Sequence, residues 1–159
     1  MHAMFGRRRD GERGSSVVEF ALFFPAMIAL SMLLIEGGNM FRAWLTLHKS
    51  AQTAVRFATT GQGDEDGSRL SQIVAQARLM QEDLPGNSPV MDVDVCSRTK
   101  PDMSLPCTGA DPGGPCEMVQ VEVRYSYQPL TPFAADLLPS DLTMEATERG
   151  INEPWKVCP

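Results

Sequence analysis

An apolar run close to the N-terminus constrains this chain more than any other feature of its sequence. Residues 17–35 contain one charged side chain, Glu19, and four arginines lie ahead of the run within residues 1–14. A helix needs roughly 20 apolar residues to cross the hydrocarbon core of a bilayer, and basic flanking residues stay on the cytoplasmic side. The run is therefore an export signal, and we expect the residues after it to reach the far side of a membrane.

Three fates are open to such a signal: cleavage after the run, retention as an uncleaved anchor, or cleavage before the run with the helix kept. An ordinary secretory signal ends in a polar stretch with small residues at the cut. Here the small residues Ala29 and Ser31 are followed by residues 32–35, which are still apolar. A lipoprotein signal needs a cysteine at the end of the run, and the first cysteine is Cys96. Cleavage after the run is therefore disfavoured.

The residues ahead of the run carry the signature of the third fate. Residues 14–20 read GSSVVEF, with Gly14 followed by an apolar helix whose fifth residue is Glu19. This pattern resembles a type IV prepilin processing site. Continued through Pro25, it is similar to the TadE-like family of pilus-assembly proteins, which belong to tight-adherence (Tad/Flp-type) systems. A looser likeness covers residues 119–129 and a later strand that ends near Glu148.

The resemblance implies a role for each matching residue. Gly14 would precede the scissile bond, Ser15 would become the new N-terminus, and Glu19 would be the assembly glutamate. Flp major pilins typically place tyrosine after this glutamate and are much shorter chains, whereas this chain has Phe20. The resemblance therefore implies a minor pilin or pseudopilin that is processed by prepilin peptidase and acts in pilus initiation, assembly or capping, and so in surface adherence.

The same resemblance implies a location and a set of partners. The chain would cross the bacterial inner membrane once, with its N-terminus cytoplasmic and its C-terminal domain periplasmic; incorporation into the extracellular pilus stays open. Its partners would be other pilins and pseudopilins, prepilin peptidase, the inner-membrane assembly platform and membrane lipid. The alternative is a single-pass anchored binding protein, an adhesin or sensor whose exported domain recognises a ligand. The mature N-terminus distinguishes the two hypotheses.

Two residues inside the apolar run need a physical explanation. A carboxylate near the start of an apolar segment is costly unless it lies at the interface or finds a partner. We favour pairing of Glu19 with the amine that processing would expose on Ser15 of a neighbouring subunit; the alternative is an interfacial residue that snorkels to water. Pro25 frees a backbone carbonyl and can bend the helix, although membrane helices tolerate proline without a special role.

The remaining pattern predicts an α+β protein. We expect a cytoplasmic leader at 1–14, which is removed, a long helix over 15–62 with its transmembrane segment at 17–36, and an exported domain over 63–159. Polar residues 61–67 break the long helix, and Ser68 is expected to cap a short helix that runs to about Glu82 and packs on a small antiparallel sheet. Alternating apolar residues predict its strands at Val90–Cys96, Met118–Tyr127 and Leu142–Thr147. Helical spacing also predicts an apolar stripe at Met40, Ala43, Trp44, Leu47, Ala51, Ala54, Val55 and Ala58.

All four cysteines lie in the expected exported part: Cys96, Cys107, Cys116 and Cys158. An even number of cysteines in an oxidising compartment predicts two disulfides, with three connectivities open. Cys96 and Cys116 fall on the polar faces of their expected strands, which favours Cys96–Cys116 and leaves Cys107 with Cys158. Zinc is the rival, but no two cysteines have C-x-x-C spacing, so we expect no metal site.

Charge and motifs restrict the function further. The net charge is −6, and the acidic excess lies after residue 38, which argues against binding to nucleic acid because phosphates demand a basic face. The sequence contains two histidines, His2 and His48, and neither a G-x-S-x-G motif nor a Walker loop. A nucleophile made of a cysteine and His48 is conceivable, but disulfides explain the cysteines better. We expect no catalytic activity and no cofactor.

Overall fold

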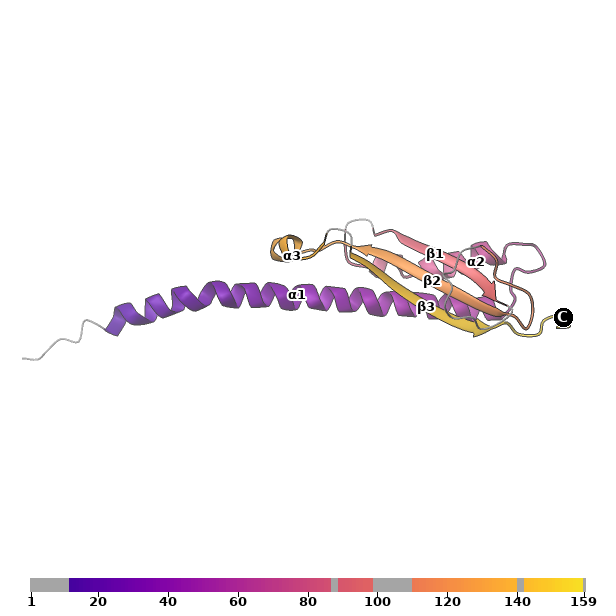
Figure 1. The fold of residues 1–159 in the computed structure, drawn as a ribbon, viewed down its shortest axis with the longest axis horizontal. Coiled ribbons are helices and arrows are strands. Elements are labelled where there is room, and N and C mark those ends of the chain that lie inside the picture. Colours follow the sequence, from indigo (N-terminus) through magenta and orange to yellow (C-terminus); the bar gives the residue numbers. More distant parts are fainter. Residues whose placement is uncertain (1–11, 87–88, 99–109, 140–141, 159) are drawn as a thin grey trace, which may run out of the picture.

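The computed structural model describes residues 12–86, 89–98, 110–139 and 142–158. The elements follow in the order α1 (Glu12–Thr59), α2 (Arg69–Arg78), the single 3-10 turn η1 (Gln81–Asp83), β1 (Met91–Arg98), β2 (Met118–Tyr127), α3 (Pro132–Leu137) and β3 (Leu142–Ile151). A long helix, a shorter helix and a small antiparallel sheet confirm the expected α+β class (Figure 1).

Helix α1 is a single rod on which the rest of the chain is mounted. Its 48 residues extend for about 72 Å at 1.5 Å per residue, and the helix continues through Pro25 and the Gly37–Gly38 pair. Figure 1 shows the sheet and α2 gathered along the C-terminal half of this rod, while the N-terminal half extends beyond them. The chain therefore has one helix in two different surroundings.

The sheet has three antiparallel strands in the order β1-β2-β3. Strand β2 has the predicted bounds, Met118–Tyr127, and its apolar and polar residues alternate from Val119 to Tyr127. Strands β1 and β3 continue further than predicted, to Arg98 and Ile151, because both pair with β2 as far as Met118. Pairing with β2 therefore sets where β1 and β3 end. The additional residues of β3, 148–151, do not alternate between apolar and polar, so their own sequence does not predict a strand.

The core lies between the inner face of the sheet and two helices. Strand β2 contributes Val119, Val121, Val123, Tyr125 and Tyr127, all buried. Small residues of α1 face them, and β3 approaches so closely that a Cβ added to Gly150 would lie 2.7 Å from Val55 Cγ1 and 2.7 Å from Thr59 Cγ2. The predicted stripe of α1 is confirmed at its buried members, Ala43, Leu47, Ala51, Ala54, Val55 and Ala58, with Met40 packed against them; Trp44 is 45% exposed.

Helix α2 packs against β1 of the sheet as predicted and also against α1, but Ser68 does not cap it as expected. Ile73 and Ala77 are buried, and Leu70 and Val74 pack against the core. Ser68 occupies the position before the helix, yet its hydroxyl donates to Asp66, 2.6 Å away, and makes no capping hydrogen bond. The cap prediction was wrong because Asp66, in the acidic loop of residues 61–67, competes for this hydroxyl. The helix also ends at Arg78, before the predicted Glu82.

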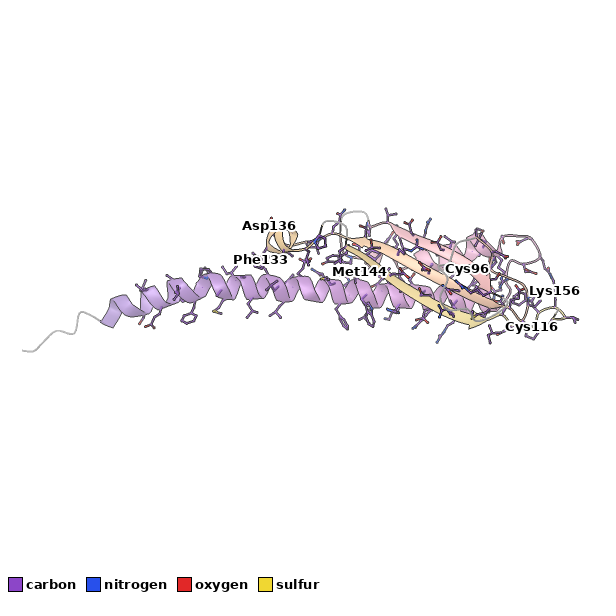
Figure 2. All side chains as sticks on the ribbon, in the orientation of Figure 1. Cys96, Cys116, Phe133, Asp136, Met144 and Lys156 are labelled. Carbon is purple, nitrogen blue, oxygen red and sulfur yellow. A yellow bond between two sulfur atoms is a disulfide. The ribbon has the colours of Figure 1, made fainter. Side chains whose placement is uncertain are left out.

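The cysteines form a different connectivity from the one favoured by the sequence. Cys116 is bonded to Cys158, so the Cys96–Cys116 and Cys107–Cys158 pairings were wrong. Strand β2 begins at Met118, and Cys116 lies before it in a turn, with a φ of 65°. The Cys116 N–H donates to the Asn152 carbonyl. This contact extends the β2–β3 pairing toward the C-terminal tail, whereas Cys96 lies within β1 (Figure 2). Cys96 is also disulfide-bonded, and Cys107 lies outside the described residues.

Candidate functional site

The N-terminal half of α1 presents an apolar surface on nearly all sides. Every residue from Val17 to Ile35 is exposed except Ala29 and Met32, which are half-buried. Among the described residues α1 alone is long and apolar enough to cross a membrane, and none of its most apolar window is buried by the rest of the chain. Large exposed side chains on this scale mark an interaction with lipid or with another protein.

The predicted assembly residues lie together at the start of this surface. Gly14 and Ser15 belong to the first turns of α1, and Glu19 is exposed on the helix one turn later. Phe20 and Phe24 lie one turn apart, with ring centroids 5.3 Å from each other and ring planes tilted by 31°. The structure brings these residues onto one continuous helix, but cleavage after Gly14 and the assembly role of Glu19 stay predictions.

Pro25 follows this pair inside the helix. A proline here cannot donate to the carbonyl four residues earlier, that of Ala21, and α1 nonetheless continues in both directions. Ser31, further along, donates its hydroxyl to the Met27 carbonyl at 2.9 Å. Such a side-chain bond gives the hydroxyl a partner within an otherwise apolar surface.

A buried carboxylate, Glu36, marks the end of the exposed apolar surface. Its side chain is 3% exposed and accepts four hydrogen bonds from the last residue of β2 and the segment that follows it. Tyr127 donates its hydroxyl to Oε1 at 2.5 Å, and the Leu130 N–H donates to the same oxygen at 3.1 Å. Thr131 donates to Oε2 twice, through its N–H at 3.0 Å and its hydroxyl at 2.9 Å. We call these four residues the Glu36 clamp.

The clamp is built so that a carboxylate can be buried. A buried charge is tolerated where hydrogen bonds replace its water shell, and Glu36 receives donors from two backbone N–H groups and two hydroxyls. Thr131 has a second task, because its hydroxyl also accepts from the Ala134 N–H at 3.3 Å and so caps α3. Burial is the larger cause, and the hydrogen bond to Glu36 the next, of a pKa of Tyr127 that lies well above its usual value of 10.0.

Sequence reasoning missed both Glu36 and α3. The argument that drew attention to Glu19, a carboxylate within an apolar helix, applies equally to Glu36 at the end of the run. Thr131 followed by Pro132 is also a helix-start signal, because threonine suits the cap position and proline the first helical position. The donors to Glu36 could not be found this way, because they lie 91 to 95 residues further along the chain.

The acidic loop at the far end of the domain is a tether for the C-terminal tail. Asp64 accepts from Lys156 Nζ at 2.6 Å and from the Trp155 indole N–H at 3.3 Å, and the bond from Lys156 lowers the pKa of Asp64 below 3.8. The Arg69 guanidinium lies 4.5 Å from the Trp155 ring. Within the described residues no three His, Cys, Asp or Glu side chains are grouped to hold a metal ion.

The comparisons with known proteins concern the long helix. Residues 14–56 match the model of the TadE-like protein family. The N-terminal segment is TadE-like. No curated protein matches the chain, and no solved structure matches it either. The TadE-like segment begins at the predicted processing site and ends three residues before the end of α1.

The match has consequences for location and partners. A TadE-like segment indicates involvement in a Tad pilus system, and hence other pilus components as partners. The chain is membrane-anchored through the exposed apolar half of α1. The sheet, α2 and α3 lie outside the matched residues, so the family model describes the helix on which this domain is mounted.

Proposed function

We propose that this chain is a minor pilin or pseudopilin of a Tad/Flp-type pilus, with a structural and not a catalytic role. The observation that carries the proposal is the TadE-like match over residues 14–56, which coincides with a helix that is apolar and exposed in one half and fixed to a domain in the other. In this proposal prepilin peptidase cuts after Gly14, and the helix that begins at Ser15 packs beside helices of neighbouring subunits. The chain initiates, caps or supports the filament.

Glu19 has the central part in assembly in this account. Cleavage after Gly14 creates an amine on Ser15, and a carboxylate in an apolar setting needs a positive partner. Pairing of Glu19 with that amine on a neighbouring chain selects the axial register of the two helices. Four residues separate Ser15 from Glu19, about one helical turn, so the register difference between paired chains is about one turn.

The test compares Glu19→Gln with Pro25→Ala at equal expression. Glutamine keeps nearly the same shape but removes the charge, so we expect processing and membrane insertion to persist while surface pili decrease about ten-fold or more, the loss expected when a buried charge is left without its partner. Pro25→Ala removes only a bend and is expected to leave piliation close to wild type. Immunoblots of cleavage and counts of surface pili provide the two measurements.

Wild-type piliation in Glu19→Gln would contradict the pairing of Glu19 with an amine. It would favour the alternative, a permanently anchored adhesin or sensor in which Glu19 is an interfacial residue. Loss of membrane insertion in that variant would likewise contradict a role restricted to assembly.

A further inference from the structure

The short segment at residues 130–137, Leu130 together with α3, is unlike the rest of the domain surface. It contains three large exposed apolar side chains: Leu130 is 49% exposed, Phe133 37% and Leu137 64%. The single charged residue of α3 is Asp136. Figure 2 shows Phe133 on the side of α3 that faces α1 and Asp136 on the opposite side. We call residues 130–137 the apolar foot.

The apolar foot lies against the apolar half of α1, away from the sheet. Figure 1 shows α3 beyond the end of the sheet, alongside α1, and the two helices are in contact. Ala29 and Met32 precede Glu36 on the same helical face, and they are the two residues of 17–35 that are half-buried. The exposed side chains of the foot therefore continue the apolar surface of the membrane-anchoring helix.

The length of the apolar run places this foot at the edge of a bilayer. From Val17 to Ile35 the helix rises about 28 Å, which matches a hydrocarbon core of about 30 Å. Glu36 would then lie at the outer border of the core. Helices that lie in the interface bury their apolar side about 5–10 Å into the boundary between headgroups and acyl chains, and that depth corresponds to the one or two turns of α1 before Glu36.

We propose that the apolar foot inserts into the membrane surface beside α1, with the Glu36 clamp fixing the depth at which the exported domain sits. The occupant of the exposed Leu130, Phe133 and Leu137 surface is phospholipid of the membrane that α1 crosses. The clamp makes this possible because it satisfies the carboxylate at the border and holds the foot by two backbone N–H groups and the Thr131 hydroxyl. The inference rests on membrane anchoring and not on the pilus role.

The test is photocrosslinking of the full chain in vesicles of phosphatidylethanolamine and phosphatidylglycerol. A photoreactive benzoyl-phenylalanine replaces Leu137, whose exposure leaves room for the probe. In separate samples the same probe replaces Phe133, which is also in the foot, or Val157. Val157 is 96% exposed at the opposite end of the domain and serves as the control. A residue seated among acyl chains meets lipid continuously, so we expect about ten-fold more phospholipid adduct at position 137 than at position 157.

A second variant tests the clamp itself. Glu36→Gln places an amide donor against donors and should release the foot, so the lipid adduct at position 137 should fall toward that at position 157 while α1 stays inserted. The intact mass of the non-reduced chain, compared with the reduced chain, verifies in each sample that the disulfides have formed.

Adducts at position 137 with a second copy or another protein, or equal lipid adducts at 137 and 157, would overturn the proposal. The Glu19→Gln piliation result is independent of this outcome.

Discussion

The two halves of α1 have the same backbone and opposite surroundings. Between Val17 and Ile35 the helix carries large apolar side chains that are exposed, whereas between Ala43 and Ala58 its inward side is buried under the sheet. The side chains differ accordingly. Large apolar residues predominate in the first half, with leucine and phenylalanine among the most frequent, and alanine recurs on the buried side of the second.

This difference shows that the amount of apolar surface does not by itself distinguish a core helix from a membrane helix. Alanines allow a sheet to approach the helix backbone, and on the sheet side Gly150 has no Cβ that would collide with the side chains of Val55 and Thr59. Large side chains on all sides leave no such face and need an apolar environment around them. The TadE-like match spans both halves, so the helix joins membrane anchoring to domain packing in one element.

The largest effect that separates the halves should come from the Cys116–Cys158 disulfide. The bond closes a segment with a sequence separation of 42, for which loop-closure entropy gives a stabilisation of about 4 kcal/mol. Cys158→Ser should lower the free energy of unfolding of the exported domain by this order and leave membrane insertion unchanged. Denaturant unfolding of the full chain in detergent measures the first quantity, and alkaline extraction of membranes measures the second. Loss of insertion would show that the halves are not independent.

A leucine pair within the second half of α1 tests which side of the helix the sheet covers. Leu47 is fully buried against the sheet, whereas Leu45, two residues earlier, is 40% exposed. Leu47→Ala should destabilise the domain by about 3 kcal/mol, because a cavity is added to the lost transfer free energy. Leu45→Ala is the matched control and should cost less than about 1 kcal/mol. Equal losses of unfolding free energy would contradict the placement of the sheet on one side of the helix.

The junction between the halves should respond to a smaller change, the removal of one hydroxyl. Tyr127→Phe deletes a hydrogen bond to the buried Glu36 carboxylate, at a cost of about 2 kcal/mol. Tyr125→Phe is the control, because its hydroxyl donates to the neutral carbonyl of Pro85 and should cost about 1 kcal/mol. Chemical unfolding of both variants at neutral pH gives the comparison, and a larger loss in Tyr125→Phe would contradict the clamp.

The Tyr127→Phe variant also gives a prediction for alkaline pH. Because burial and Glu36 raise the pKa of Tyr127 in the folded chain, its contribution to stability is fully present below pH 10 and decreases as pH rises above that value. Burial also raises the pKa of Tyr125. The stability contributed by each of the two tyrosines therefore decreases as pH rises above 10. Stability curves recorded across this range should be flatter for Tyr127→Phe than for the unaltered chain.

The sequence predicts the parts of the fold that depend on local periodicity. Strand β2 was predicted to the residue, since valines and tyrosines alternate with polar residues from Val119 to its end. The apolar run and the alanine stripe likewise predicted both halves of α1. The fold class followed from these elements, since a long helix with three alternating strands can bury its apolar faces only by packing one on the other.

The remaining features depend on contacts between distant residues, which local patterns do not encode. The Cys116–Cys158 bond follows from the register of β2 with β3 and from the tail that Asp64, Trp155 and Lys156 hold in place. Alternation alone extended β2 to Cys116 and so suggested Cys96 as its partner. Glu36 illustrates the same limit, because its position was visible in the sequence while its donors were not.

The most direct test of the account is the mass of the mature chain isolated from a strain with an active prepilin peptidase. If α1 is an assembly helix released by processing, the chain begins at Ser15 and retains the whole apolar run. In a matched sample, replacement of Gly14 by leucine should leave the leader attached. A native chain that keeps Met1, or that begins after Ser31 and has lost most of the apolar helix, would contradict the assignment of α1 to pilus assembly.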